Sequence, residues 1–236
     1  METIGSLHRE ILGCTACQDA GFIELAAPVI CAQEGSKMML IGQAPGQVEL
    51  ELRRPFQGRA GRELFRWMAS IGISEQEFRD AVYMTSITKC FPGKARSGSG
   101  DRRPSAREIE LCRPFLERQL AVIRPETILL VGGMAIERYL PGRPLGELIG
   151  KLFEQDGRRL IPLPHPSGAS RWLNDPEHRE LLRRALNLLR SEWDRLGLRA
   201  PAVVAPFMGA APLSRPRRPL AQEFDGVGSH EGEIFP

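Results

Sequence analysis

The chain has 236 residues, of which 42% are hydrophobic and 26% are charged, and its formal net charge is +3. This composition is typical of one globular domain with a tail, and the mild positive charge is compatible with a nucleic-acid partner. No apolar run approaches the about 20 residues of a membrane-spanning helix, and the first residues lack the pattern of a secretory signal. We therefore expect a cytoplasmic protein with no membrane partner, in which cysteines are ligands or thiols rather than disulfides.

Apolar runs and helical periodicity alternate along the chain. The expected helices cover residues 3–13, 62–70, 105–123, 134–139 and 176–196, with a further short helix after the capping box that begins at Ser74. The expected strands are residues 38–41, 81–88, 126–131 and 159–163. An Asp-Gly turn at 156–157 indicates a hairpin that includes the last of these strands. Strands that alternate with helices predict an α/β fold with a parallel sheet and helices on both faces.

The character of the chain changes after Gly197. Residues 199–236 are rich in Pro, Gly and Ala and show no periodicity. This composition predicts a disordered tail, so we expect the folded domain to cover residues 1–198.

Residues 38–61 combine a buried strand with a glycine-rich turn. The apolar residues 38–41 run directly into Gly42-Gln43-Ala44-Pro45-Gly46, and Glu49 and Phe56 follow. In open α/β sheets ligands bind at the ends of strands, and glycines let backbone N–H groups approach a ligand closely. A ring, an amide, backbone donors and a carboxylate are what a pocket for a planar polar base needs. On its own, however, the pattern is equally that of an ordinary tight turn.

A second turn holds a histidine between two prolines. The apolar residues 160–163 end in Pro164-His165-Pro166-Ser167-Gly168, and the prolines leave the backbone around His165 little freedom. Two turns at strand ends, one with amides and acids and one with a fixed imidazole, suggest a single site. The alternative for this segment is a rigid surface turn.

The cysteines include one short metal-binding pattern. Cys14 and Cys17 form a C-x-x-C motif, in which the turn lets both thiolates point toward one metal. Alone, this motif is compatible with redox, structural or accidental pairing. Cys31 lies in an apolar segment, which predicts a buried structural thiol.

The segments GQAPGQVELELRRPFQGRAG (residues 42–61) and LPHPSG (residues 163–168) resemble the two motifs of the uracil-DNA glycosylase superfamily. The first is most similar to the iron–sulfur family, called family four, whose pattern G-E-A-P-G-x-x-E-D and R-P-F-V-G-x-A-G it matches without a gap. The resemblance covers about residues 10–195. It implies a three-layer α/β/α fold with a central four-stranded, mainly parallel sheet.

The same resemblance implies an activity. It predicts a monofunctional, monomeric DNA glycosylase of base excision repair, which hydrolyses the N-glycosidic bond of uracil or a related deaminated base flipped out of DNA. Phe56 would stack on the base and His165 would stabilise the anion that develops on it. The residues that bind the base would be Gly42, Gln43, Ala44 and Ser86. Those that press on the DNA backbone, or fill the gap left by the flipped base, would be Pro166, Ser167, Gly168 and Arg171.

The resembled family also carries an iron–sulfur cluster. Its ligands are an N-terminal C-x-x-C, a cysteine after a Y-x-T-N-x-x-K-C strand and a cysteine on the next helix. Cys14, Cys17, Cys90 and Cys112 match these positions. We therefore expect a structural [4Fe–4S] cluster, with zinc as the runner-up. The segment between the last two cysteines is longer than the family leads us to expect.

The loop from Phe91 to Pro104 is basic and rich in glycine and serine. It is either a solvated loop or a contact to DNA phosphates, and its place beside the site favours DNA contacts from Lys94, Arg102 and Arg103. A cross-linking branch of the superfamily carries a reactive histidine here. This loop has none, so we expect no covalent trapping.

Two departures from the family pattern concern selectivity. Gln43 replaces a glutamate, and since an amide is no general base at neutral pH, Glu49 becomes the candidate carboxylate. Ser86 replaces an asparagine that reads the uracil edge, and it has a shorter reach. Two other functions therefore stay open: a glycosylase that prefers hypoxanthine or xanthine, and a non-catalytic iron–sulfur protein that binds DNA.

Overall fold

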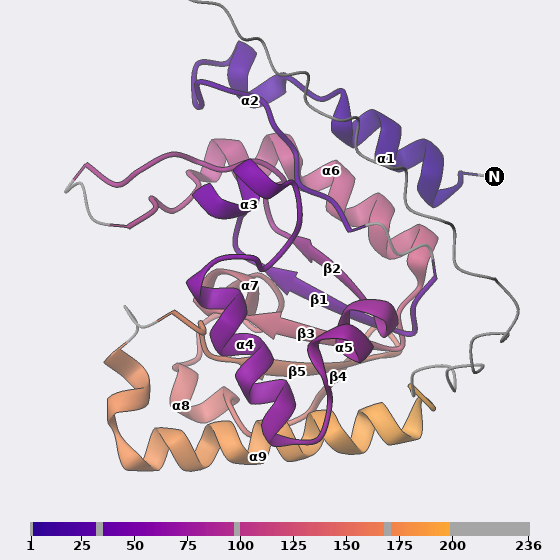
Figure 1. The fold of residues 1–236 in the computed structure, drawn as a ribbon, viewed down its shortest axis with the longest axis vertical. Helices are drawn as coiled ribbons and strands as arrows, with labels where there is room; N and C mark the ends of the chain where they lie inside the picture. Colours follow the sequence, from indigo (N-terminus) through magenta and orange to yellow (C-terminus); the bar gives the residue numbers. More distant parts are fainter. Residues whose placement is uncertain (1, 32–34, 97–99, 168–170, 199–236) are drawn as a thin grey trace, which may run out of the picture. The chain divides into compact units, whose positions relative to one another are not determined.

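The computed structural model describes residues 2–31, 35–96, 100–167 and 171–198, and these contain one sheet of five strands in the order β2-β1-β3-β5-β4 (Figure 1). The strands are β1 (Met38–Gly42), β2 (Val82–Ser86), β3 (Thr127–Val131), β4 (Phe153–Gln155) and β5 (Arg158–Leu163). β1 pairs in parallel with β2 and β3, β3 pairs in parallel with β5, and β4 is antiparallel to β5.

The predicted α/β class is confirmed, and the expected number of strands is corrected from four to five. The extra strand is β4, which pairs with β5 through the hairpin that the Asp156-Gly157 turn predicted. Both turn residues have positive φ, 51° and 71°, as a two-residue hairpin loop requires. The sheet is therefore mainly parallel with one short antiparallel edge.

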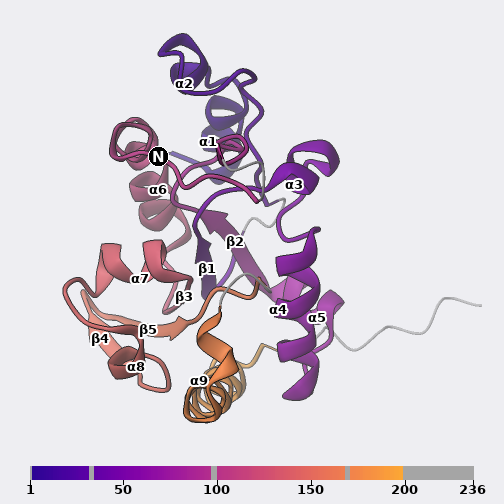
Figure 2. The same ribbon diagram turned by 90° about the vertical axis from the view of Figure 1, so that its left-hand side faces the viewer.

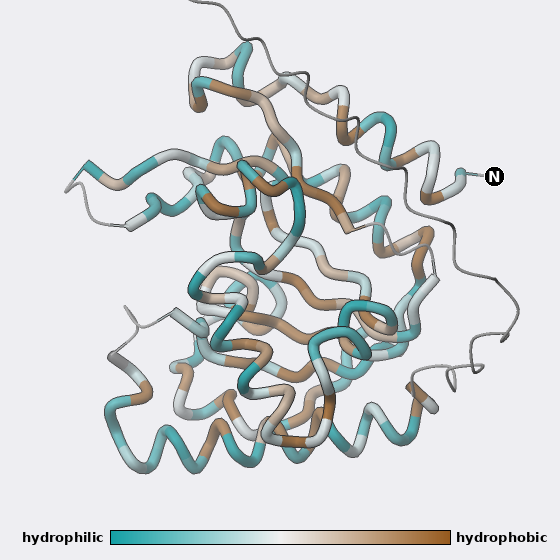
Figure 3. Tube along the Cα trace, in the orientation of Figure 1, coloured by the Kyte–Doolittle hydropathy of each residue, from teal (hydrophilic) through white to brown (hydrophobic). Residues whose placement is uncertain are grey.

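β1 and β3, inside the sheet, read as mostly apolar runs because helices cover both of their faces. Every residue of β1, β2 and β3 is buried. The hydrophobic colouring in Figure 3 accordingly follows these strands through the middle of the domain.

The helices are α1 (Ile4–Leu12), α2 (Ala16–Asp19), α3 (Gln47–Leu52), α4 (Arg59–Ser70), α5 (Glu75–Ala81), α6 (Ala106–Ile123), α7 (Gly133–Tyr139), α8 (Leu145–Leu148) and α9 (Pro176–Arg195), with a 3-10 helix η1 (Arg171–Asn174). The predicted capping boxes at Ser74 and Ser105 are confirmed at the starts of α5 and α6. Asp175 caps α9, with proline at its first position. The short helix α3 was not predicted, since a glycine rather than a capping side chain precedes it.

One helical layer consists of α4, α5 and α9. The ring of Phe78 on α5 lies 6.1 Å from that of Phe65 on α4 and stacks at 6.1 Å on Trp193 of α9. Aromatic rings dominate this packing because each buries a large apolar area. Figure 2 shows α4 and α5 on the opposite side of the sheet from α6 and α7.

The other layer, with α1, α6 and α7, is joined to β2 by a buried hydrogen-bond chain. His8 and Gln119 each lie 2.7 Å from the hydroxyl of Tyr83, and Thr85 donates to Gln119 at 2.9 Å. Such a chain orients α1 and α6 on the sheet, because each buried polar group needs its partner. Leu12, the last residue of α1, is 53% exposed.

No helix in the described part of the chain is long and apolar enough to cross a membrane. The predicted boundary at 198 and the predicted tail 199–236 lie at and beyond the end of the described residues. The division into domain and tail therefore stays a prediction.

Candidate functional site

The two turns singled out by their sequence lie at the same edge of the sheet. Gln43 follows the end of β1, and His165 follows the end of β5. Since these strands are parallel and only β3 separates them, their ends are about 10 Å apart. Figure 2 views the domain from the side on which the strands end.

Backbone hydrogen bonds extend the sheet beyond the strands and fix both turns. The N–H of Thr88 donates to the carbonyl of Gln43 at 3.2 Å, and the N–H of Gly132 donates to the carbonyl of Leu163 at 2.9 Å. The chain therefore enters each turn in a defined direction, set by the neighbouring strand.

The imidazole of His165 has a defined tautomer when it is neutral. Its Nδ1 lies 3.2 Å from the backbone nitrogen of Ser167, which donates to it, and 2.9 Å from the hydroxyl of the same residue. Because Nδ1 accepts, the ring proton is assigned to Nε2, the atom on the other side of the ring. Burial, followed by the charge of Arg103, lowers the pKa of His165. The ring is thus held neutral, with one N–H donor pointing away from its own turn.

Gly132, at the end of β3, forms the floor beneath this ring. A Cβ at position 132 would lie 3.0 Å from Cδ2 of His165, and the residue has φ of +87°. Glycine is therefore required twice, for its backbone conformation and for the close approach of the imidazole.

Phe56 lies over the end of β1. Its Cζ is 3.3 Å from the position of a Cβ built on Gly42, and the carbonyl of Thr85 lies 3.7 Å from the same point. The ring of Phe56 thus lies beside the strand ends that position Gln43 and Ser86. A side chain at position 42 would occupy the place of the ring.

Glu49 is buried, and its carboxylate is bonded to the backbone of its own loop. One oxygen accepts from the N–H groups of Gln57 and Gly58, both at 2.8 Å, and the other from Gly46 at 3.1 Å. Glu49 thus joins the start of α3, at Gly46, to the segment Gln57–Gly58 that precedes α4. The predicted catalytic role of Glu49 stays a prediction, and the structure adds a positioning role that its sequence did not indicate.

Ser86 ends β2 beside Gly42 and is buried. Its hydroxyl donates to the carbonyl of Thr88 at 2.8 Å. The short side chain therefore folds back on its own strand end.

The basic loop contributes a residue near each of the two turns. Asp101 Oδ2 lies 3.0 Å from a Cβ built on Gly46, and Arg103 is close enough to His165 to lower the pKa of its imidazole. The predicted DNA contacts of this loop stay a prediction.

The three predicted DNA contacts of this loop have different surroundings. Lys94 pairs with Asp101 at 2.9 Å. Arg102 donates to both oxygens of Glu108, at 2.7 and 2.8 Å, and to the carbonyl of Phe22 at 2.7 Å. Arg103 is exposed and has no ion pair among the residues that the structure describes.

The predicted contacts after His165 are described in part. Pro166 is buried and Ser167 contacts His165. Gly168 lies outside the described residues, as does the side chain of Arg171, whose backbone begins η1.

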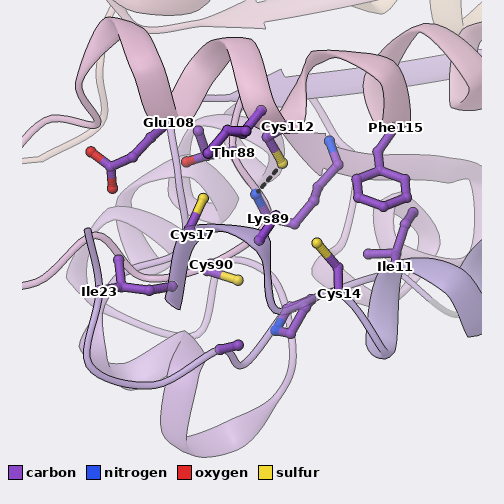
Figure 4. A pocket seen from close by; sticks show the side chains of 14 residues that line it. Ile11, Cys14, Cys17, Ile23, Thr88, Lys89, Cys90, Glu108, Cys112 and Phe115 are labelled. Atoms are coloured by element: carbon purple, nitrogen blue, oxygen red, sulfur yellow. Dashed lines mark hydrogen bonds between the residues drawn. The ribbon is translucent and has the colours of Figure 1, made fainter. Parts of the chain in front are cut away.

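The four cysteines predicted as ligands line one cavity (Figure 4). Cys14 follows α1, Cys17 lies on α2, Cys90 follows β2 and Cys112 is on α6. Cys31 does not line this cavity and is buried in the hydrophobic core, as predicted. Three segments that are distant in the chain therefore bring four thiols to one place.

The thiols are close enough to affect one another. Burial, with the charges of Cys112 and Cys90 as smaller causes, raises the pKa of Cys17 to about 12. Burial also raises the pKa of Cys90 to about 11, with contributions from Cys112 and Cys14. Among the described residues, no three Cys, His, Asp or Glu side chains converge as tightly as one metal ion requires. The thiols line the cavity wall, an arrangement that fits a cofactor in which each thiolate binds its own metal atom.

Lys89 connects this cavity to the strand-end site. It is fully buried, its backbone N–H donates to Sγ of Cys112 at 3.3 Å, and its ammonium donates to the carbonyl of Ser86. One residue thus contacts a cysteine of the cavity and the residue beside the base-binding turn.

Comparison with models of known protein families assigns the chain to one of them. The model of the Uracil DNA glycosylase superfamily matches residues 29–190, which include both turns, Cys31, Cys90 and Cys112. The chain belongs to this superfamily. It is accordingly a DNA glycosylase, a hydrolase that acts on N-glycosyl bonds in DNA.

Individual relatives within the superfamily cover most of the chain. It is 31% identical to a type-4 uracil-DNA glycosylase of Archaeoglobus fulgidus, over 76% of this chain and 88% of the relative. It is 28% identical to the type-4 enzyme of Sulfurisphaera tokodaii (80% and 84% covered) and 29% identical to that of Thermotoga maritima (70% and 82% covered).

Sequence reasoning missed several residues that position the superfamily site. Gly132 was recognised as the end of a strand but not as the floor under His165. The roles of Glu49 and Arg102 as internal hydrogen-bond partners were also missed. The capping box of Ser105 with Glu108 gave a partial signal, since it placed this carboxylate at the start of α6.

The pKa of His165 can be tested directly. We expect NMR titration of its ring protons to give a pKa below the ordinary 6.5, because burial and Arg103 both disfavour the imidazolium. Arg103→Gln should raise the pKa, but not to the ordinary value, since burial is the larger cause. Arg107→Gln is the control, because Arg107 pairs with Glu110 on the exposed side of α6. A pKa above 6.5 in the unmodified protein would contradict this account.

Proposed function

We propose that this chain is a monofunctional uracil-DNA glycosylase of base excision repair. The observation that carries the proposal is the neutral imidazole of His165, whose Nε2–H donor lies at the sheet edge that also bears Gln43 and Phe56. Relatives that are named type-4 uracil-DNA glycosylases and align over most of the chain support uracil as the base. Nothing comparable supports the alternatives of hypoxanthine, xanthine or a non-catalytic role.

Binding requires the nucleotide to leave the base stack, because its glycosidic bond is out of reach inside a duplex. The flipped base stacks on Phe56, and the backbone N–H groups around Gln43 and Ala44 bind its carbonyls. Gly42 allows the ring of Phe56 its place at the end of β1. Ser86, beside them, lines the edge of the base.

Cleavage moves the electrons of the N–C1′ bond onto the base. The Nε2–H of His165 stabilises the resulting anion at a uracil carbonyl, as a donor in an oxyanion hole does. Water adds to C1′, releases a proton to solvent, and leaves an abasic site, while the departing base takes up a proton. Gln43 orients this water through its amide oxygen, and the negative charge of Glu49 stabilises the positive sugar.

The DNA backbone lies against the turn after β5 and the loop before α6. Ser167, Gly168 and Arg171 follow His165 in sequence, and the exposed Arg103 is close enough to lower the pKa of His165. Lys94 and Arg102 contribute less, because each is paired with a carboxylate of the protein.

The cavity lined by cysteines holds a [4Fe–4S] cluster through Cys14, Cys17, Cys90 and Cys112. Its support is the donor set, four thiols around one cavity. When bound, the cluster supplies iron–thiolate bonds that tie the N-terminal segment to α6 and to the end of β2.

The protein acts as a monomer in the cytoplasm, with its folded domain in residues 1–198.

The proposed activity is tested with single-stranded oligonucleotides that contain one uracil, hypoxanthine or xanthine, with thymine as the control. We expect abasic product from uracil, and His165→Ala should slow its formation about ten- to a thousandfold. The measurement is alkaline cleavage of the product after single-turnover reaction. Product from hypoxanthine alone would assign a different base, and an unchanged rate in His165→Ala would remove this residue from the mechanism.

Gly132, which lies under the ring of His165, and its neighbour Gly133 form a matched pair for mutation. Gly132→Ala should slow uracil excision about 10- to 100-fold, because the new methyl group displaces the imidazole and its positive φ strains alanine. Gly133→Ala is the control, since a Cβ there meets nothing within 4 Å. Equal rates for the two variants would show that Gly132 does not position His165.

The cluster predicts a brown protein that absorbs in the visible and contains iron. Cys112→Ala should lose colour and iron, because a ligand is removed, whereas Cys31→Ala should keep both. Metal analysis of the purified proteins makes the comparison. Colourless protein with stoichiometric zinc would show that zinc, and not an iron–sulfur cluster, is the bound metal.

A further inference from the structure

Phe56, which we assign to stack on the base, has an unusual backbone conformation. Its φ is +54°, in the left-handed region that residues with a side chain rarely adopt. Such a conformation costs free energy and persists only where its surroundings enforce it. Residues that contact the Phe56 backbone must therefore stabilise this conformation.

A buried arginine on the neighbouring helix holds this backbone. Arg79 of α5 is 6% exposed, and its two terminal nitrogens donate to the carbonyls of Pro55 and Phe56, each at 2.9 Å. Its Nε donates to Glu75 at 2.7 Å, and its guanidinium lies 4.4 Å from the ring centre of Phe65. All three directions of the planar guanidinium are thus used, two of them on consecutive carbonyls of one loop.

Two further residues close the same loop. A Cβ on Gly61 would lie 2.0 Å from the carbonyl oxygen of Phe56, so only glycine lets α4 approach this carbonyl. On the other side, Glu49 accepts from the N–H groups of Gln57 and Gly58. The carbonyl groups of Pro55 and Phe56 are therefore held by Arg79. The N–H groups of the next two residues are held by Glu49.

The consequence is a fixed place for the aromatic ring. With its backbone held on both sides, Phe56 directs its ring across Gly42 to the end of β1. An unrestrained phenylalanine would relax to negative φ, and its ring would leave the strand end.

We propose that Arg79 is a positioning residue for base excision, which holds Phe56 in the left-handed conformation that presents its ring to the flipped base. This inference rests on the proposed function, since the ring needs a base to stack on. Arg79 itself touches no base, because the loop lies between them. Lysine cannot replace it, since a single ammonium lacks the planar fork that spans two carbonyls.

The inference predicts that Arg79 acts through Phe56 alone, which a double-mutant cycle tests. Stacking of an aromatic ring on a base contributes enough for its loss to slow excision about 5- to 100-fold, so we expect this range for Phe56→Ala. Arg79→Lys should slow the single-turnover rate severalfold in the unmodified chain, by no more than Phe56→Ala does, and less than about twofold in the Phe56→Ala background. Enzyme in saturating excess makes the rate constant independent of the folded fraction. Affinity for uracil-free DNA should not change.

Arg190→Lys is the matched control. This arginine also donates to two loop carbonyls, those of Ile71 and Gly72, but at the far end of α4. Its replacement should leave the excision rate unchanged. If Arg79→Lys does not fold, Glu75→Ala serves instead, because it removes a partner of Arg79 while Glu75 is 53% exposed. It should slow excision about threefold in the unmodified chain and have no effect in Phe56→Ala.

Each outcome decides one question. Equal losses from Arg79→Lys in both backgrounds, or an unchanged rate in the unmodified one, would overturn the positioning role and leave the proposed function standing. Should Glu75→Ala be the variant used, an unchanged rate would overturn it in the same way. An unmodified chain that releases no uracil would refute the proposed function, and this inference with it.

Discussion

The parallel hydrogen-bond ladder that joins β1, β3 and β5 determines where the chemistry of this protein takes place. It brings the ends of β1 and β5 to one edge, so Gln43 and His165 follow neighbouring strand ends although they are distant in sequence. β3 lies between them and contributes Gly132, whose missing side chain leaves room for the imidazole. A shift of one residue in this register would turn alternate side chains to the other face and separate the groups of the site.

Charged side chains within the loops hold the site in shape. Glu49 accepts three backbone N–H bonds, Arg79 donates to two backbone carbonyls, and Arg102 joins Glu108 to the loop at Phe22. Hydrogen bonds to charged groups contribute about 1.5–3 kcal/mol each, more than bonds between neutral groups. They are suited to irregular segments, where no strand or helix satisfies the backbone. The apolar core stabilises the sheet, and these charged side chains stabilise the loops that connect the strands and helices.

The cysteine cavity and the strand-end site share a boundary at the end of β2. Lys89 donates its backbone N–H to Cys112 and its ammonium to the carbonyl of Ser86. A group that binds the four thiols would therefore also fix the end of β2, where the edge of the base is expected. The long loop between Cys90 and Cys112 also carries Arg103, whose charge lowers the pKa of His165. Despite the length of this segment, Cys112 lines the cavity.

The sequence by itself determined the elements and motifs that depend on near neighbours. Capping boxes, the Asp-Gly hairpin turn and the buried strands act within a few residues, so local patterns reveal them. The set of four cysteines followed from the resemblance to a known family, since its members are distant in the chain. Only the tertiary structure decided which polar groups are occupied inside the protein. Glu49, Arg79 and Arg102 find partners on other segments, and a charged residue in the sequence looks the same whether it faces DNA or a backbone carbonyl. The left-handed conformation of Phe56 belongs to this second group, because packing against α4 and α5 enforces what its own residue type disfavours.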